Sequence, residues 1–145
     1  MIANLQEYFR PEIGIFLDAV EYKRIEEPNT EVKTEIAILC QDNVNASLNE
    51  DGVRILITRH VKFDPEKIFT LSVTFGADLK FTDRKLDYNW KDINLNEEFM
   101  ENGDFVTSQL VSRISLIIGE ITSSFGQQPL LLPAFLAKKN SSDKE

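Results

Sequence analysis

The sequence is poor in the residues that build disulfides, metal sites and many catalytic centres. Its 145 residues include one cysteine, one histidine and one tryptophan. The single cysteine, Cys40, allows no internal disulfide and no thiolate metal cluster, which fits a reducing compartment. We interpret Cys40 as a small buried hydrophobe and His60 as a solvent-facing residue on the polar face of a strand. A thiol nucleophile would need a histidine close by, and His60 is the only candidate.

The sequence also lacks the short motifs of common catalytic and nucleotide-binding sites. It has no P-loop, no glycine-rich dinucleotide turn and no Gly-x-Ser-x-Gly elbow. Carboxylates are plentiful, as in Glu26-Glu27 and Glu97-Glu98, but their spacing matches no EF-hand loop. We therefore predict a protein that is not an enzyme and that has no catalytic residues, metal or cofactor.

Long hydrophobic runs are missing too. No stretch approaches the roughly 18 apolar residues of a membrane span, and Met1 to Arg10 lacks the pattern of a signal peptide. We expect cytoplasmic localisation. The net charge of −8 disfavours nucleic acid as a partner and is compatible with basic polypeptides, although solubility is its simplest explanation.

Length and composition are those of one ordinary globular domain. We expect a single domain over residues 1–137. Residues 138–145 are charged and contain serine, which predicts a mobile tail.

Alternating hydrophobicity predicts strands. From Ile68 to Phe81, apolar side chains occupy every second position, which is typical of a half-buried antiparallel strand. The apolar set is Phe69, Leu71, Val73, Phe75, Ala77, Leu79 and Phe81. Val53 to Phe63 alternates likewise, with Arg59 as the exception on its apolar face. Asp64 to Lys67 joins the two stretches, so we predict a β-hairpin.

Two weaker patterns complete a four-stranded antiparallel sheet. Ile13 to Glu26 alternates imperfectly, which predicts a strand with a bulge or burial on both faces; on this pattern Phe16, Val20 and Tyr22 share a face. Val32 to Cys40 is a shorter candidate, and its start is also compatible with helix. We interpret Asn43 to Gly52 as a polar loop.

Phe105 to Ser124 predicts a long amphipathic helix, with Asp104 as its N-cap and Gly126 as its stop. Its apolar stripe is wide enough for two buried surfaces, the sheet and a second subunit. We expect the residues of this stripe to form an oligomer interface, and they are Leu110, Ile114, Ile117 and Ile121. Asn94 to Glu101 predicts one or two further helical turns. The predicted fold class is α+β, with one long C-terminal helix on the sheet.

The long connection from Thr82 to Gly103 carries Tyr88, Trp90 and Phe99 among charged residues. Aromatic residues in a polar connection either pack beneath it or form a contact surface. After the helix, Pro129 and Pro133 bracket a leucine run, which predicts an extended, packed segment.

This order of elements resembles the SecB family of export chaperones. The hairpin stretches from Val53 and Ile68 look like that family's central hairpin. The helix from Leu110 and the segment Gly126 to Pro133 look like its main helix and the glycine, proline and leucine segment that follows. The leucine segment is shorter than is usual there, so the chain is similar to a divergent member.

The resemblance implies binding without catalysis: an ATP-independent holdase for unfolded polypeptides, in protein export or for one client such as an antitoxin. It implies a homo-oligomer, dimer or tetramer, and a translocase motor as a possible partner. The client-binding candidates are the crossover aromatics and the C-terminal segment, namely Tyr88, Trp90, Phe99, Leu130, Leu131, Leu132 and Phe135.

Two other functions fit the residues. One is a small-ligand binder in which a curved sheet grips a helix; this needs a cavity of roughly 300 Å³ or more. The other is an oligomeric regulatory or structural subunit that uses the helix only for self-association.

Overall fold

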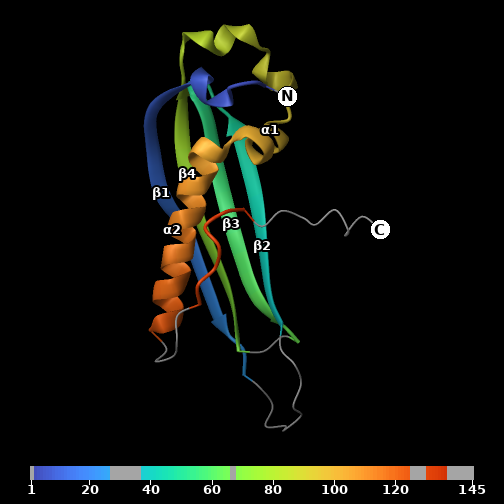
Figure 1. Cartoon of the computed structure of the whole chain (residues 1–145), viewed down its shortest axis with the longest axis vertical. Helices are drawn as coiled ribbons and strands as arrows, with labels where there is room; N and C mark the ends of the chain where they lie inside the picture. The colour runs from blue at the N-terminus through green and yellow to red at the C-terminus, as the bar shows by residue number, and fades with distance from the viewer. Residues whose placement is uncertain (1, 27–36, 66–67, 125–129, 137–145) are drawn as a thin grey trace, which may run out of the picture.

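A computed structural model gives the fold and describes residues 2–26, 37–65, 68–124 and 130–136. Four antiparallel strands form one sheet in the order β1-β4-β3-β2. Their bounds are β1 Phe9–Arg24, β2 Ala37–Leu48, β3 Gly52–Asp64 and β4 Phe69–Phe81. The long helix α2 (Asp104–Ser123) covers one face of the sheet, and the short helix α1 (Leu95–Asn102) packs against β2 (Figure 1). The predicted fold class is confirmed.

The central hairpin is the pair β3 and β4. Its register runs from Gly52 opposite Lys80 to Val61 opposite Leu71, as the alternation predicts. The apolar set of β4 is buried and faces α2. Thr74 points to the opposite face, where its hydroxyl lies 2.7 Å from that of Thr58. Burial of each such Val, Leu, Ile or Phe side chain stabilises the fold by about 1.5–3 kcal/mol, so this hairpin and α2 form the centre of the core.

Strand β2 corrects one prediction. Most of the stretch interpreted as a polar loop is strand, paired with β3 as far as Leu48 opposite Val53. Polar residues such as Asn43 and Asn45 alternate with Val44 and Ala46 because one face of this edge strand is exposed to solvent. Only the turn at Asn49 remains a loop, closed by its side-chain oxygen accepting from the amides of residues 51 and 52. Residues 32–36 of the predicted strand lie outside the described residues.

Strand β1 contains the predicted irregularity. Its register with β4 shifts between Leu17 and Ala19, as a bulge requires. The shift places Leu17 opposite Phe75 and Val20 opposite Val73, so both face the side of the sheet that carries α2. Phe16 lies on the other face, above Gly76. The predicted shared face of Phe16 and Val20 was therefore wrong, because the extra residue reverses the alternation.

Both helices match their predicted positions, with one difference in capping. Asn94 caps α1, its side-chain oxygen accepting from the amide of Glu97 at 3.2 Å. Helix α2 has Gly103 as its N-cap, and Asp104 is the first helical residue. Asp104 therefore favours the helix through its charge near the N-terminus, not as the predicted cap. Gly126 and the tail of residues 138–145 lie outside the described residues, and the domain boundaries stay a prediction.

Candidate functional site

The crossover aromatics lie at one end of the sheet, where the connection between β4 and α1 forms two short 3-10 turns. Trp90 is 6% exposed and donates from its ring nitrogen to the carbonyl of Lys85 at 2.7 Å. Its ring centroid lies 4.9 Å from that of Phe81, and Phe99 is fully buried beside Phe9. These rings close the end of the core.

Tyr88 is the one crossover candidate of the three with substantial exposure, at 39%. Its ring still packs on Tyr8, with centroids 5.4 Å apart. The client contact of Trp90 and Phe99 stays a prediction, but their burial argues against it, because neither ring is available at the surface. The alternative of a packed cluster beneath the loop describes both residues.

Residues 130–136, the C-terminal strap, lie between α2 and the β3–β2 side of the sheet (Figure 1). Three leucines of the strap pack against the core, namely Leu130, Leu132 and Leu136. Leu131 and Phe135 project outward and are 79% and 67% exposed. The amide of Leu130 donates to the hydroxyl of Thr122 on α2 at 2.7 Å. Four of the seven predicted client-binding residues therefore share this one segment, in which Leu130 and Leu132 pack on the core while Leu131 and Phe135 face solvent.

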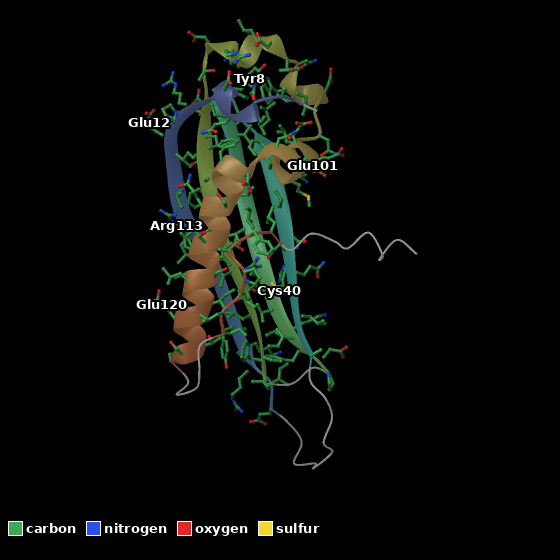
Figure 2. All side chains as sticks on the ribbon, viewed as in Figure 1. Tyr8, Glu12, Cys40, Glu101, Arg113 and Glu120 are labelled. Atoms are coloured by element: carbon green, nitrogen blue, oxygen red, sulfur yellow. The ribbon has the colours of Figure 1, made fainter. Side chains whose placement is uncertain are left out.

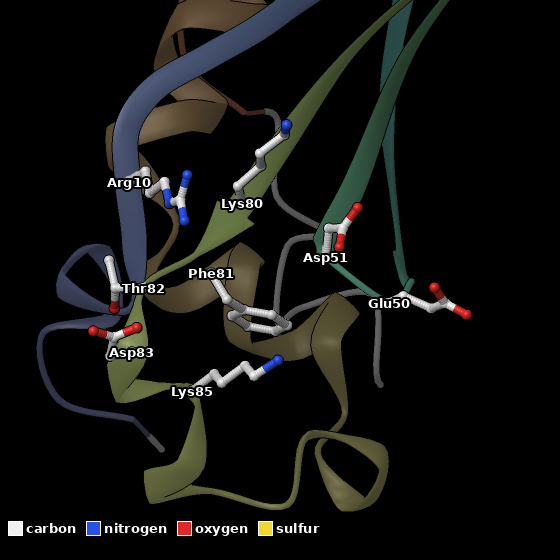
Figure 3. A pocket seen from close by; sticks show the side chains of 8 residues that line it. All are labelled: Arg10, Glu50, Asp51, Lys80, Phe81, Thr82, Asp83 and Lys85. Carbon is white, nitrogen blue, oxygen red and sulfur yellow. The ribbon is translucent and has the colours of Figure 1, made fainter.

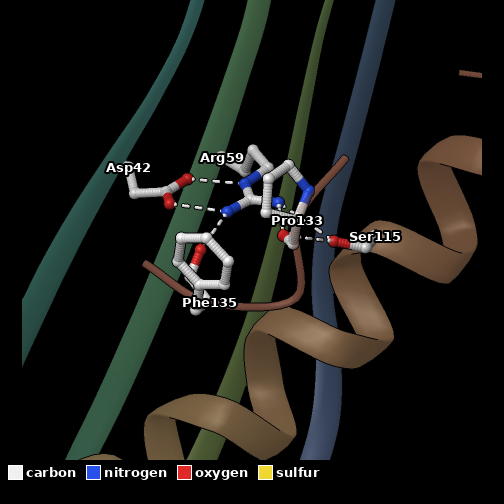
Figure 4. A network of polar contacts seen from close by, with 5 residues as sticks. All are labelled: Asp42, Arg59, Ser115, Pro133 and Phe135. Atoms are coloured by element: carbon white, nitrogen blue, oxygen red, sulfur yellow. Dashed lines mark hydrogen bonds and ion pairs between the residues drawn. The ribbon is translucent and has the colours of Figure 1, made fainter. Parts of the chain in front are cut away.

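A buried charged residue holds the strap through its main chain. Arg59 of β3 forms a two-pronged ion pair with Asp42 of β2, both contacts being 2.8 Å, and each side chain is 1% exposed. The remaining guanidinium donors bind the carbonyls of Pro133 at 2.6 Å and Phe135 at 2.8 Å (Figure 4). Ser115 of α2 lies 2.9 Å from Arg59 and also donates to the Pro133 carbonyl.

Arg59 remains charged in this setting. Burial alone would lower the pKa of Arg59, but hydrogen bonding to Asp42 and its negative charge outweigh burial and raise it. Nearby, burial raises the pKa of the Cys40 thiol, which keeps it protonated and unreactive. Breaking a buried pair of this kind typically costs about 3–5 kcal/mol, so Asp42 holds Arg59 in place, and Arg59 in turn binds the two carbonyls of the strap.

Sequence reasoning did not identify Arg59 or Asp42 as site residues. Arg59 did stand out as the exception on an otherwise apolar strand face. Its partner could not be found, because Asp42 lies between the predicted strand, which ended at Cys40, and the predicted loop, which began at Asn43. An arginine among buried positions of a strand indicates a buried acceptor, because a buried charge needs a partner. Here most of its acceptors lie in segments far away in the sequence.

A groove lies beside the outer end of the strap. Its volume is about 370 Å³, and it is lined by Met100, Glu101, Asp104, Thr107, Ser108, Phe135 and Leu136. Apolar side chains from α1 and the strap thus lie beside two carboxylates, Glu101 of α1 and Asp104 at the start of α2. Figure 2 shows Glu101 close to this junction of the two helices. The groove suits an apolar side chain that has a positive charge next to it.

The four residues predicted to form an oligomer interface divide into two pairs. Leu110 and Ile114 are fully buried against the sheet within this chain. Their part in an oligomer interface stays a prediction, but their burial argues against it, because the helix turns both toward the sheet of the same chain. Ile117 and Ile121 are only partly buried. They leave apolar surface on α2.

A second depression, of about 300 Å³, lies at the sheet end between the β2–β3 turn and the crossover. Arg10, Lys80 and Lys85 line it together with Glu50, Asp51 and Asp83 (Figure 3). Charges of both signs alternate around it, so it has no preference for an anion or a cation.

Within the described parts of the chain, no group of three or more His, Cys, Asp or Glu residues is placed to hold a metal ion. No helix in the same residues is long and apolar enough to cross a membrane.

Comparison with known proteins gives a structural match without a sequence match. No family model matches the chain, and no curated protein matches it. Among solved structures, it is similar to the Mycobacterium tuberculosis SecB-like chaperone Rv1957 in complex with a ChAD peptide from the Rv1956 HigA1 antitoxin. The TM-score is 0.64 at 13% identity, covering 88% of this chain and 86% of that one. The chain therefore has a SecB-like fold.

Proposed function

We propose that the protein is an ATP-independent chaperone that binds unfolded or partly folded polypeptides. The observation that carries this proposal is the strap, which presents Leu131 and Phe135 to solvent on a firmly held segment. Large apolar side chains on a fixed surface favour binding, because little conformational freedom is lost when a partner covers them. The SecB-like fold, found in a chaperone solved with an antitoxin peptide, supports the same function.

The client class follows from the charge around this surface. The groove beside Phe135 contains Glu101 and Asp104, and the whole chain carries a net charge of −8. Apolar segments that also carry Lys or Arg fit such a surface. The antitoxin peptide bound by the neighbouring structure supports a single dedicated client. A role in protein export, a translocase motor as partner, a cytoplasmic location and the absence of catalysis stay predictions.

Aggregation of reduced lysozyme, a basic client, tests the proposal directly. The chain has a single cysteine, so dithiothreitol breaks no internal disulfide in it while it reduces the client. We expect light scattering to fall as the protein approaches an equimolar amount, with and without ATP. Serum albumin at the same mass concentration is the control for crowding. Aggregation that is unchanged by the protein would contradict the proposed function.

The alternative of a small-ligand binder is less well supported. A ligand gripped between helix and sheet needs space there. That layer is instead filled by fully buried side chains from both elements, including Leu110, Ile114 and Ile118 opposite Ile55 and Val73. The remaining alternative, a structural subunit, differs from a chaperone by showing self-association without client binding.

We also propose self-association through the sheet and α2. On the face that carries α2, β1 leaves Leu17, Val20 and Tyr22 between 40% and 51% exposed, and Ile117 adds apolar surface from the helix. Ile117→Asp would place a charge in this contact, and we expect it to yield monomers in native mass measurements. Glu120→Asp, at an exposed helical position, is the control. Wild-type protein that is monomeric at micromolar concentration would rule the contact out.

A further inference from the structure

The strap is positioned mainly by contacts that do not depend on its outward side chains. Arg59 binds the main-chain carbonyls of Pro133 and Phe135, and Thr122 accepts from the main-chain amide of Leu130. The inward leucines supply the packing. The side chains of Leu131 and Phe135 contribute little to either set of contacts, as their exposures of 79% and 67% show.

The buried pair makes the carbonyl contacts directional. Asp42 occupies two donors of the guanidinium plane, which leaves Arg59 a fixed set of N–H groups aimed at the strap. Two carbonyls bound to one rigid plane restrict both the position and the rotation of the extended segment. Arg59 thus holds the main chain at Pro133 and Phe135 (Figure 4), and the bond from the Leu130 amide to Thr122 holds it next to residue 131.

From this arrangement we infer that Arg59 is the positioning residue of the client-binding surface. Residues 131 and 135 are its specificity-determining positions for an extended, apolar and basic client segment. This inference rests on the proposed function. The groove next to Phe135 has a mixed lining, and its carboxylates Glu101 and Asp104 fit the basic residues of that segment. Because the strap is ordered before binding, its ordering entropy does not oppose association.

A double-mutant cycle between Arg59→Lys and Phe135→Ser tests this role. Lysine retains the positive charge opposite Asp42 but has no planar fork, so it cannot bind Asp42 and both carbonyls together. The probe is reduced, carbamidomethylated lysozyme, which is unfolded and basic, with its Kd measured per folded molecule. We expect Phe135→Ser to weaken binding about tenfold in wild-type protein and by less than about twofold in the Arg59→Lys background.

Two further variants, which change the buried network less, test the same role if Arg59→Lys does not fold. Thr122→Val removes the acceptor for the Leu130 amide with little change of shape, and Ser115→Ala removes the hydroxyl that contacts both Arg59 and Pro133. Ser112→Ala is the matched control, since that hydroxyl donates only to the Ser108 carbonyl within α2. We expect faster strap hydrogen exchange and weaker client binding for the first two variants, and neither change for the control.

The outcomes separate the alternatives. Additive effects of Arg59→Lys and Phe135→Ser would show that Arg59 acts on stability alone and would overturn the inference. Tighter binding when the strap is loosened would also overturn it, because the strap would then compete with the client. If wild-type protein binds no client, the proposed function fails and this role with it. If it binds and the cycle is additive, only the positioning role fails.

Discussion

The crossover and the C-terminal strap differ in how they use their apolar residues. The crossover is a long connection from Thr82 to Gly103, the strap is the segment of residues 130–136, and both carry predicted client-binding residues. The crossover turns Trp90 and Phe99 into the end of the core, where aromatic rings pack on one another. The strap turns Leu131 and Phe135 outward, because its main chain is bound from beneath by Arg59.

The difference shows that the exposure of an apolar side chain depends on which groups form hydrogen bonds with the main chain next to it. In the crossover, hydrogen bonds are local, such as that from Trp90 to Lys85, so the side chains are free to supply the packing. In the strap, a distant arginine binds the carbonyls of Pro133 and Phe135, while Leu132 and Leu136 pack on the core and the side chains of residues 131 and 135 face solvent. The first region stabilises the fold, whereas the second is available to a partner.

The largest expected effect is a loss of stability from a substitution in the crossover. Phe99→Ala removes a fully buried ring, and we expect a loss of about 3–5 kcal/mol in the free energy of unfolding. The client Kd per folded molecule should not change. Chemical denaturation and binding assays on the same samples measure both quantities. Leu86→Ala, in the same connection and 84% exposed, is the control and should change neither.

The strap offers a matched pair of neighbouring leucines. Leu131→Ser removes an exposed side chain and should weaken client binding about tenfold while leaving the melting temperature unchanged. Leu132→Ser removes a side chain packed on the core and should destabilise the protein by about 1–3 kcal/mol. Equal effects of the two substitutions on stability would mean that, in solution, Leu132 is not packed on the core while Leu131 is exposed.

Tyr88 is the crossover aromatic that could most readily bind a client, because part of its ring is exposed. Its ring packs on Tyr8 and Trp90, with centroid distances of 5.4 and 6.0 Å. We expect Tyr88→Ser to cost about 1 kcal/mol of stability through the lost ring contacts. Client affinity should stay constant in the same titration assay. A clear loss of affinity would show that the crossover contributes to client binding through Tyr88.

The smallest effect is expected on the opposite face of the sheet, which belongs to neither region. Arg54 and Asp78 form a half-exposed ion pair there at 2.7 Å, and its hydrogen bonds lower the pKa of Asp78. Asp78→Asn should cost less than about 1 kcal/mol at pH 7. Because the folded pKa is the lower one, this contribution is present above the unfolded value of about 3.9 and is lost as pH falls below it.

Urea unfolding of wild-type and Asp78→Asn protein at pH 7 and at about pH 3 measures this dependence. The difference in stability between the two proteins should shrink at the lower pH. A difference that grows on acidification would show that the ion pair does not lower the pKa of Asp78.

Much of this architecture follows from periodicity alone. The hairpin and α2 have long, regular patterns, so their type and the buried face of β4 could be predicted. Only the first part of strand β2, up to Cys40, was predicted; the rest was missed because its solvent face is polar and its alternation is weak, with Ala46 among the inward residues. The reversal of Phe16 and Val20 depends on the exact place of a bulge, which one sequence does not specify.

The candidate site was only partly predictable for a related reason. The leucine segment and its proline boundaries indicate an extended strap, but they do not say which side chains face outward. That choice depends on Arg59, whose contacts join residues 42, 115, 133 and 135. Contacts at such sequence separations leave no local pattern. The burial of Trp90 similarly depends on Tyr8 and Phe9 from the far end of the chain.

Site-specific photo-crosslinking tests the central claim most directly. p-Benzoylphenylalanine replaces Leu131 in one protein and Tyr88 in another, both at exposed positions, and each is irradiated with reduced, carbamidomethylated lysozyme. The account predicts cross-linked client from position 131 and little or none from position 88. Cross-linking from position 88 with none from position 131 would contradict it, because the client would then lie on the crossover and not on the strap.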